Sequence, residues 1–149
     1  MIISLSVESV LAELKQRYDH GSFEYNDPST NLRTIVTSHF CSISRKNERY
    51  GIYIVRQKNT QEILYIGKSG TIDSEGHFKG QDIPGRLRNV KDGNIPANDW
   101  FRDVFREKGV LLIEYIFLPI SESPAFIETA LLQAYLNEHH CLPYKNRSL

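Results

Sequence analysis

The chain has 149 residues, of which 40% are hydrophobic and 24% charged, and its 18 basic side chains balance 18 acidic ones. This composition is ordinary for a globular protein, and the length allows one domain. A net charge of zero is unusual for a protein that binds DNA tightly by neutralising phosphates. Residues 35–95, however, carry ten basic against six acidic side chains, which allows a local basic cleft. We find neither a signal-peptide pattern nor an apolar run of transmembrane length, so we expect a soluble, cytoplasmic protein without a membrane partner.

Residues 1–49 are expected to form a helical extension that precedes the main domain. Ser6 can cap a helix over residues 6–19, where apolar side chains recur at helical spacing. A polar stretch over residues 22–33 predicts a loop, and residues 34–43 predict a strand. The helix either covers the sheet or forms a contact in a dimer, and this alternative stays open.

Two runs rich in β-branched and aromatic residues follow, joined by a polar turn: residues 51–56 and 63–67. If the turn centres on Asn59, Tyr53 lies opposite Tyr65. Arg56 then lies opposite Glu62 and predicts a cross-strand ion pair. Side chains alternate between the two faces of a strand, so this register places both phenols side by side on one face. A register slip of one residue would separate them.

The second half of the chain adds helices and one further strand. We expect helices over residues 84–90 and 97–108, a strand over residues 110–118, and a last helix that begins at Ser123-Pro124. Gly109 ends the second of these helices, and serine followed by proline is typical of a helix start. The predicted fold class is therefore α/β, of the α+β kind: a small three-stranded antiparallel sheet flanked by helices, with an extra N-terminal helix.

The predicted hairpin carries two tripeptides in order, Gly51-Ile52-Tyr53 and Tyr65-Ile66-Gly67, and Lys68 follows directly. Downstream stand an arginine in Gly85-Arg86-Leu87, a glutamate in Phe126-Ile127-Glu128, and an asparagine in Pro143-Tyr144-Lys145-Asn146. This ordered set resembles the GIY-YIG nuclease family. That family includes certain homing endonucleases, the N-terminal domain of an excinuclease component and some type II restriction enzymes. The resemblance covers roughly residues 50–147, and the expected order strand, strand, helix, helix, strand, helix resembles the family's small sandwich. It implies a nuclease-like domain over residues 50–149.

The resemblance implies a role for each phenol and for the lysine. Tyr53 matches the tyrosine proposed as general base toward the attacking water. Tyr65 matches the second phenol of the site, to which some relatives give that role instead. A phenol ordinarily has a pKa of about 10, so it needs nearby positive charge to act as a base near neutral pH, and Lys68 matches the family lysine that could supply it.

The resemblance also implies a phosphate ligand, a metal ligand and a residue that orders the site. Arg86 matches the arginine that neutralises the scissile phosphate as its charge develops. Glu128 matches the single carboxylate that binds Mg²⁺ or Mn²⁺. The helix around it is largely apolar, so this carboxylate needs a partner, and a metal ion is the first candidate. Asn146 matches the terminal asparagine that helps to order the site.

Four residues are further candidates for substrate contacts: His77, Lys79, Arg88 and Lys91. Arg88 competes with Arg86 for the phosphate role, and we prefer Arg86 because its sequence context fits the family's helix pattern better. Val90 stands where relatives commonly have tyrosine or histidine, and His77 is a candidate substitute. The glycine-rich, polar segment 68–80 is longer than in the shortest relatives, and it predicts a mobile excursion that contacts DNA or a partner protein.

These residues predict a divalent-metal-dependent endonuclease that hydrolyses phosphodiester bonds of DNA. Two alternatives stay open: a degenerate relative that binds nucleic acid without cutting it, suggested by Val90 and the zero net charge, and a protein-interaction domain. A nuclease with one active site per chain needs two sites or two visits to break both strands, so a homodimer is a further open expectation. Cys41 and Cys141 lack the spacing of a zinc site, and no zinc is expected.

Overall fold

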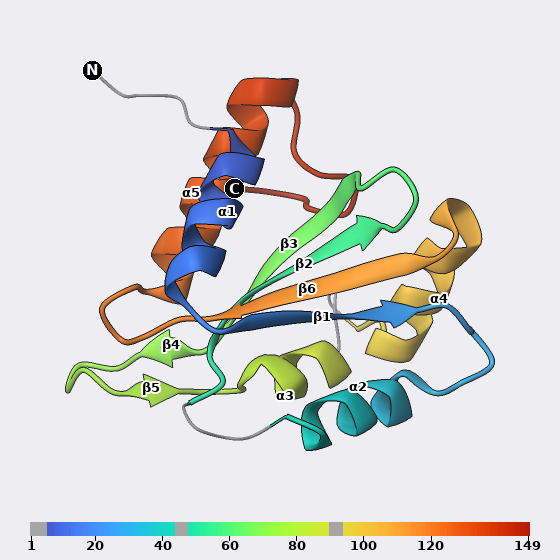
Figure 1. Cartoon of the computed structure of the whole chain (residues 1–149), viewed down its shortest axis with the longest axis horizontal. Helices are drawn as coiled ribbons and strands as arrows, with labels where there is room; N and C mark the ends of the chain where they lie inside the picture. The colour runs from blue at the N-terminus through green and yellow to red at the C-terminus, as the bar shows by residue number, and fades with distance from the viewer. Residues whose placement is uncertain (1–5, 44–47, 90–93) are drawn as a thin grey trace.

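The computed structural model describes residues 6–43, 48–89 and 94–149, and these form five helices and six strands. The helices are α1 (Val7–Arg17), α2 (Leu32–Cys41), α3 (Ile83–Arg88), α4 (Ala97–Lys108) and α5 (Pro124–His139). The strands are β1 (His20–Tyr25), β2 (Gly51–Gln57), β3 (Ile63–Ser69), β4 (Thr71–Ile72), β5 (Phe78–Lys79) and β6 (Leu111–Phe117). Four of the strands form one antiparallel sheet in the order β1-β6-β2-β3, and β4 and β5 form a separate short hairpin (Figure 1).

The main sheet has four strands, so the expectation of three was wrong. The fourth strand, β1, pairs antiparallel with β6 from His20 opposite Ile116 to Tyr25 opposite Leu111. The segment expected as a loop over residues 22–33 thus begins inside a strand. Phe23 and Tyr25 reach the core on one face of β1, while Glu24 between them does not. A period of two residues indicates a strand, but the polar residues of this segment favoured a loop and obscured the period.

Residues 34–43 were expected to form a strand, but most of them lie in helix α2. Asn31 caps this helix, because its side chain accepts a hydrogen bond from the backbone N–H of Arg33. Leu32, Val36 and Phe40 recur at every fourth position and are buried on one side of the helix. The β-branched residues between them favour a strand, but this helical spacing of the buried side chains outweighs that preference.

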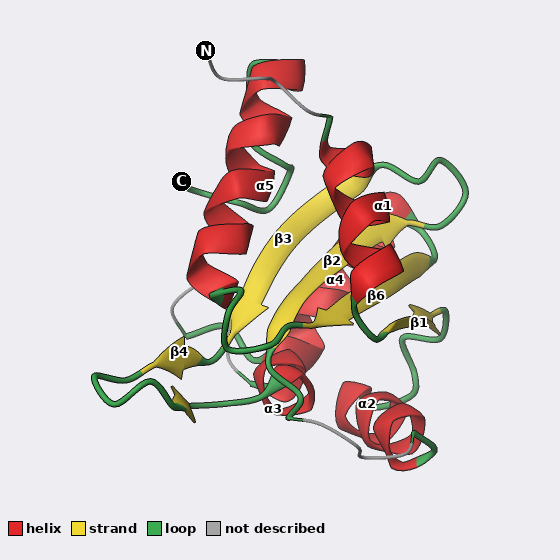
Figure 2. Ribbon diagram, turned by 60° about the vertical axis from the view of Figure 1, so that its left-hand side comes forward, coloured by secondary structure: helices red, strands yellow, loops and turns green. Residues whose placement is uncertain are grey.

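Helices cover both faces of the sheet: α1 and α5 pack on one face, and α2, α3 and α4 pack on the other (Figure 2). The side chains of β2 alternate accordingly. Ile52 and Ile54 join the cluster under α1 and α5, whereas Tyr53 and Val55 join a cluster rich in aromatic residues on the other face, here called the aromatic cluster. Burial on both faces explains why β2 is almost continuously apolar.

The pairing of β2 with β3 differs by two residues from the expected register. Tyr53 lies opposite Gly67, and Tyr65 lies opposite Val55, with an irregularity between Val55 and Arg56. A shift of two residues keeps every side chain on its face, whereas a shift of one would not. The two phenols therefore share one face of the sheet, although they lie diagonally and not directly opposite each other.

Arg56 pairs with Glu114 on β6 and with Glu8 on α1, not with Glu62 as expected. Its guanidinium is almost completely buried, and it donates at 2.7 Å to each carboxylate oxygen of Glu8. Lys15 of α1 completes the network, with its Nζ 2.6 Å from the Glu114 carboxylate. These contacts attach α1 to the sheet.

The described part of residues 1–49 is integrated with the rest of the chain, because α1 and α2 cover opposite faces of the sheet and β1 extends it. This segment contributes the strand β1 as well as two helices, and the domain boundary near residue 49 stays a prediction. Ser6 and Ser123 cap their helices as expected. The two helices and the strand predicted between residues 84 and 118 agree with the structure within one or two residues at each end, and the last helix begins where it was expected. Among the described residues, no helix has the length and apolarity needed to span a membrane.

Candidate active site

A cleft of about 290 Å³ lies beside β3, the β4–β5 hairpin, α3 and α5. Its lining comprises Tyr65, Lys68, Gly70, Thr71, Lys79, Gly80, Gln81, Arg86 and Glu128. Four side chains that the sequence singled out for catalysis or metal binding therefore meet in one cleft: Tyr65, Lys68, Arg86 and Glu128. Three basic side chains and one carboxylate line it, so the cleft is positively charged although the whole chain is neutral.

Tyr53 and Tyr65 are neighbours on β2 and β3, with ring centroids 5.9 Å apart, and their side chains share a hydrogen bond. Gly67 lies against both rings. A Cβ at this position would be 2.5 Å from Cζ of Tyr53 and 2.7 Å from Cε2 of Tyr65. Any larger residue would collide with the rings, so the glycine that ends the second tripeptide has a steric reason for its presence.

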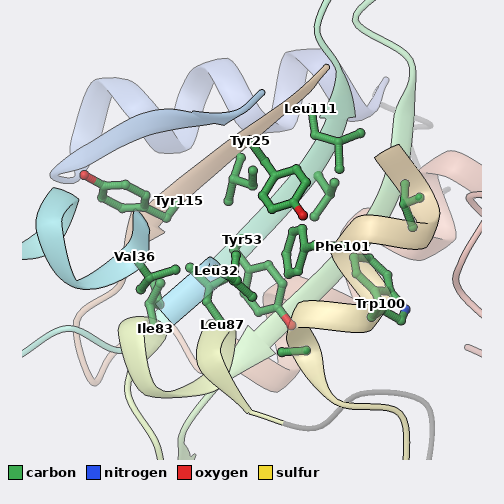
Figure 3. Packing of buried hydrophobic residues seen from close by; sticks show 14 of the residues in the cluster. Tyr25, Leu32, Val36, Tyr53, Ile83, Leu87, Trp100, Phe101, Leu111 and Tyr115 are labelled. Atoms are coloured by element: carbon green, nitrogen blue, oxygen red, sulfur yellow. The ribbon is translucent and has the colours of Figure 1, made fainter. Parts of the chain in front are cut away.

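The two phenols differ in depth. Tyr53 is fully buried in the aromatic cluster between the sheet, α3 and α4 (Figure 3), whereas Tyr65 is partly exposed and lines the cleft. Burial raises the pKa of Tyr53 well above its usual value; the neighbouring Tyr65 adds to this rise and Arg86 partly opposes it. The Tyr53 phenol therefore keeps its proton near neutral pH and can donate to the oxygen of Tyr65.

The structure separates the two arginines that competed for the phosphate role. Arg86 on α3 lines the cleft together with Glu128. Arg88 directs its guanidinium toward α2, where Nη1 donates to the Thr37 hydroxyl at 3.0 Å, and it lines a different hollow. Residues two positions apart on a helix point to different sides, which explains why only one of the pair reaches the cleft. This geometry favours Arg86.

Glu128 lies in the second turn of α5 and is half-buried. Burial raises the pKa of its carboxyl group, while the positive charges of Lys68 and Arg86 act in the opposite direction. Lys68 also donates through Nζ to the carbonyl oxygen of Gly70 at 3.4 Å. Phe126, two residues before the glutamate, is 71% exposed, so the apolar side of α5 is narrower than expected. In the cleft, the Glu128 carboxylate thus has two positively charged neighbours, Lys68 and Arg86.

Glu128 is the only carboxylate that lines the cleft within the described ranges. Across the same ranges, no group of three or more His, Cys, Asp or Glu side chains is placed to hold a metal ion. A divalent cation at this carboxylate would have to take its remaining ligands from substrate and water. Mg²⁺ and Mn²⁺ accept such coordination, because they prefer oxygen ligands and Mg²⁺ usually retains several waters.

Asn146 lies at the outer edge of β3, outside the cleft. Its side-chain amide donates to the carbonyl oxygen of Ile66 and accepts from the N–H of the same residue, both at 2.9 Å. The backbone N–H of Lys145 donates to the carbonyl of Leu64 at 2.8 Å. The C-terminal segment therefore runs along the part of β3 that carries Tyr65, which is compatible with the ordering role expected for Asn146.

The remaining candidates for substrate contacts have different locations. Lys79 lines the cleft. His77 is exposed, with Nδ1 3.9 Å from the Glu75 carboxylate, and it lines a separate hollow of about 610 Å³. Lys91 and Val90 lie outside the described residues. His77 is therefore not brought to the cleft as a substitute for the side chain missing at position 90.

The segment expected as a mobile excursion over residues 68–80 contains the β4–β5 hairpin. Asp73 closes its turn, because its side chain accepts hydrogen bonds from the backbone N–H groups of Glu75 and His77. The hairpin and the residues beside it bring four residues to the cleft that the sequence had not identified: Gly70, Thr71, Gly80 and Gln81. Asp73 followed by Gly76 is the turn signal that could have located the hairpin, but nothing in the sequence marked these four residues as part of a cleft.

No family model, no curated protein sequence and no solved structure matched this chain. The function is therefore inferred from the residues of the chain and from the geometry and charge of its cleft.

Proposed function

We propose that this chain is an endonuclease of the GIY-YIG type, which hydrolyses phosphodiester bonds of DNA with the help of a divalent metal ion. The observation that carries the proposal is the cleft in which Tyr65, Lys68, Arg86 and Glu128 meet, with Tyr53 hydrogen-bonded to Tyr65. The order β2, β3, α3, α4, β6 and α5 also agrees with the order that the family resemblance implies.

The charge of the cleft suits a phosphodiester. Lys68, Lys79 and Arg86 supply positive charge to a cleft of only about 290 Å³. In the cleavage step, the guanidinium of Arg86 would stabilise the negative charge that develops on the phosphate. Because the rest of the chain adds no net positive charge, we expect modest affinity for nonspecific DNA.

We assign the phenol beside the attacking water to Tyr65 and a positioning role to Tyr53. Tyr65 lines the cleft and packs edge-on against Trp100, with ring centroids 5.2 Å apart. The hydroxyl of Tyr53 retains its proton, because burial raises its pKa. It can therefore donate a hydrogen bond to Tyr65 and hold that oxygen in place. In this proposal, the general-base role that the family resemblance gives to Tyr53 passes to Tyr65.

The cleft fits a hard divalent cation such as Mg²⁺ or Mn²⁺. Glu128 would hold the ion, and oxygens of the substrate and water would complete its coordination. When bound, the ion would polarise the phosphate and stabilise its developing charge. Burial raises the pKa of Glu128, so a cation that binds the ionised carboxylate would compensate for the lost solvation.

A degenerate domain that binds nucleic acid or a protein without cutting is the alternative. The full burial of Tyr53 favours it, because a general base must contact the water that it activates. This alternative predicts DNA retention by the basic residues of the cleft in the absence of cleavage.

The test is cleavage of supercoiled plasmid by the purified chain with Mg²⁺ or Mn²⁺ and, separately, with excess chelator. We expect metal-dependent nicking or linearisation. Glu128→Gln keeps the shape of the side chain and removes its charge, so it should abolish cleavage while the protein stays folded. Arg86→Ala should lower the cleavage rate by about 10²–10³-fold. Arg88→Ala, the matched control on the same helix, should retain nearly full activity, because its guanidinium contacts α2.

The outcomes separate the two functions. Cleavage by Glu128→Gln at the normal rate would remove this carboxylate from the site, and equal losses in Arg86→Ala and Arg88→Ala would contradict the assignment of the cleft. If no metal supports cleavage, but Arg86→Ala weakens a gel shift that Arg88→Ala does not, the chain is a binding module.

A further inference from the structure

The two edges of the main sheet differ. At the β3 edge, the C-terminal segment lies along the strand through Lys145 and Asn146. At the other edge, β1 pairs with β6, and the described part of the chain supplies no further strand beside it. β1 also contains no proline, lysine or bulge, which are devices that block the edge of a sheet. Within the described ranges, one edge of the sheet is therefore covered, and the other has no strand paired with it.

Every second residue of β1 directs its backbone hydrogen-bonding groups away from β6. The backbone N–H of Phe117 donates to the carbonyl of Asp19 at 2.9 Å, so the odd-numbered residues of β1 face β6 in this antiparallel ladder. The N–H and C=O groups of His20, Ser22 and Glu24 consequently point outward. Their side chains lie on the face of β1 opposite to the aromatic cluster, and those of His20 and Ser22 are exposed.

We propose that a second copy of this chain pairs antiparallel with β1 about a twofold axis at Ser22, which joins the two main sheets into one. In this register, His20 of each copy faces Glu24 of the other, and Ser22 faces its own counterpart. All facing positions are those with outward backbone groups, so the pairing forms about six backbone hydrogen bonds. A register shift of one residue would oppose residues whose backbone groups already bind β6.

The charge pattern of β1 identifies the partner as a second copy. A twofold antiparallel pairing requires complementary side chains at equal distances from the axis, and His20 and Glu24 meet this condition around Ser22. His20 holds its Nδ1 3.1 Å from the carbonyl of Tyr18. A positively charged imidazole donates through both ring nitrogens, so in that form Nε2 is left to donate to a partner carboxylate. Glu24 binds Lys58 through one carboxylate oxygen at 2.9 Å and keeps the other for the partner's histidine.

The pairing leaves the cleft of each copy open, because no residue of β1 lines it. The proposal is independent of the nuclease function, and it can be tested on protein that has no DNA or metal bound. The interface is small, so we expect reversible association with a dissociation constant on the order of micromolar to tens of micromolar.

Sedimentation velocity over a wide concentration range tests the proposal directly. The wild-type chain should shift reversibly from monomer to dimer. Ser22→Pro removes the outward N–H at the axis and leaves the ladder with β6 intact, so it should raise the dissociation constant at least about tenfold. Ser22→Ala keeps the backbone donor and should associate like wild type. Circular dichroism and thermal unfolding verify that each variant is folded.

A charge exchange tests the register even if proline disturbs the strand. His20→Glu places two glutamates opposite each other and should weaken association. The double variant His20→Glu/Glu24→Lys restores two complementary pairs and should recover dimerisation, because each position faces only the other. A double variant that stays as weak as His20→Glu would overturn this register.

Oxidative cross-linking gives a positional readout. With Cys41 and Cys141 replaced by serine, Ser22→Cys should form a disulfide-linked dimer, because facing Cα atoms of such a pair are about 5.5 Å apart. Ser38→Cys, exposed on α2, should not. A chain that stays monomeric at every concentration would overturn the proposal, as would a dimer that Ser22→Pro and the charge variants leave unchanged.

Discussion

Gly67 offers a sharp test of the packing around the two tyrosines. A Cβ added there would lie 2.5 Å from Cζ of Tyr53, 2.7 Å from its hydroxyl oxygen and 2.7 Å from Cε2 of Tyr65. Carbon atoms pack at about 3.5–4.0 Å, so Gly67→Ala must displace the rings by about 1 Å. Tyr53 is fully buried, so its ring cannot move out into solvent. Overpacking of this kind costs about 1–3 kcal/mol of unfolding free energy, which corresponds to a fall in Tm of about 2–12 °C for a protein of this size.

The same displacement would move the phenol that lines the cleft. If the proposed function is correct, a misplacement of about 1 Å lowers the catalytic rate about 10²-fold. At a temperature at which Gly67→Ala is still folded, its rate of plasmid cleavage should therefore fall far more than its loss of stability explains. Urea unfolding followed by circular dichroism measures the stability, and the initial rate of nicking per folded molecule measures the activity.

Gly109→Ala is the matched control. Gly109 ends α4 with φ of 80°, and a Cβ there would meet no atom within 4 Å, so alanine is strained only by its backbone. With ψ of −155°, Gly109 adopts a backbone conformation that essentially only glycine adopts, so the expected cost is about 1–3 kcal/mol, without loss of cleavage by the folded protein. Wild-type stability of Gly67→Ala would refute the packing described here. Equal losses of cleavage in both variants would show that instability, and not displacement of the rings, lowers the rate.

Three further substitutions test the charges and hydrogen bonds of the fold. Glu114→Ala leaves the buried guanidinium of Arg56 without one of its two carboxylates and should lower the unfolding free energy by about 3 kcal/mol in urea titrations. Glu128→Gln should instead raise stability by about 0.5–2 kcal/mol at neutral pH. Burial raises the pKa of Glu128 in the folded state, so its ionised form destabilises the fold above that pKa. The stability gained by Glu128→Gln should therefore vanish below the unfolded-state pKa of about 4.5, where the glutamate is protonated in both states. An equal gain in stability at acidic pH would contradict this explanation. Asn146→Ala removes two hydrogen bonds to Ile66 and should cost about 1–2 kcal/mol and speed hydrogen exchange of the Ile66 amide, whereas unchanged exchange would contradict its contact with β3.

Elements with strong local signals could be predicted from the sequence. Ser6 and Ser123 accept hydrogen bonds from the first turns of α1 and α5, and Gly109 ends α4. These residues act on their immediate neighbours, so their effect is visible without knowledge of the fold. The apolar runs that became β2 and β6 also give clear signals, because short runs rich in β-branched, aromatic and other large apolar residues favour buried strands.

The segment between α1 and β2 could not be predicted, because its local signals conflict with its tertiary contacts. β1 contains glycine, histidine and serine, which are weak strand formers, and it becomes a strand by pairing with β6 about ninety residues later. α2 contains β-branched residues that favour a strand, yet its buried side chains follow a helical period. In both cases the deciding partner is distant in the chain.

The candidate site divides in the same way. That Tyr53 and Tyr65 share a face follows from the two-residue period of strands, and a register error of two residues left it unchanged. Their depth depends on the helices that pack over the sheet, which bury Tyr53 completely and leave Tyr65 partly exposed at the cleft. Because burial raises the pKa of Tyr53, two identical side chains in neighbouring strands acquire different chemistry from their surroundings. If Tyr65 is the phenol that contacts the attacking water, Tyr65→Phe must slow cleavage more than Tyr53→Phe does, and the opposite order would return the base role to Tyr53.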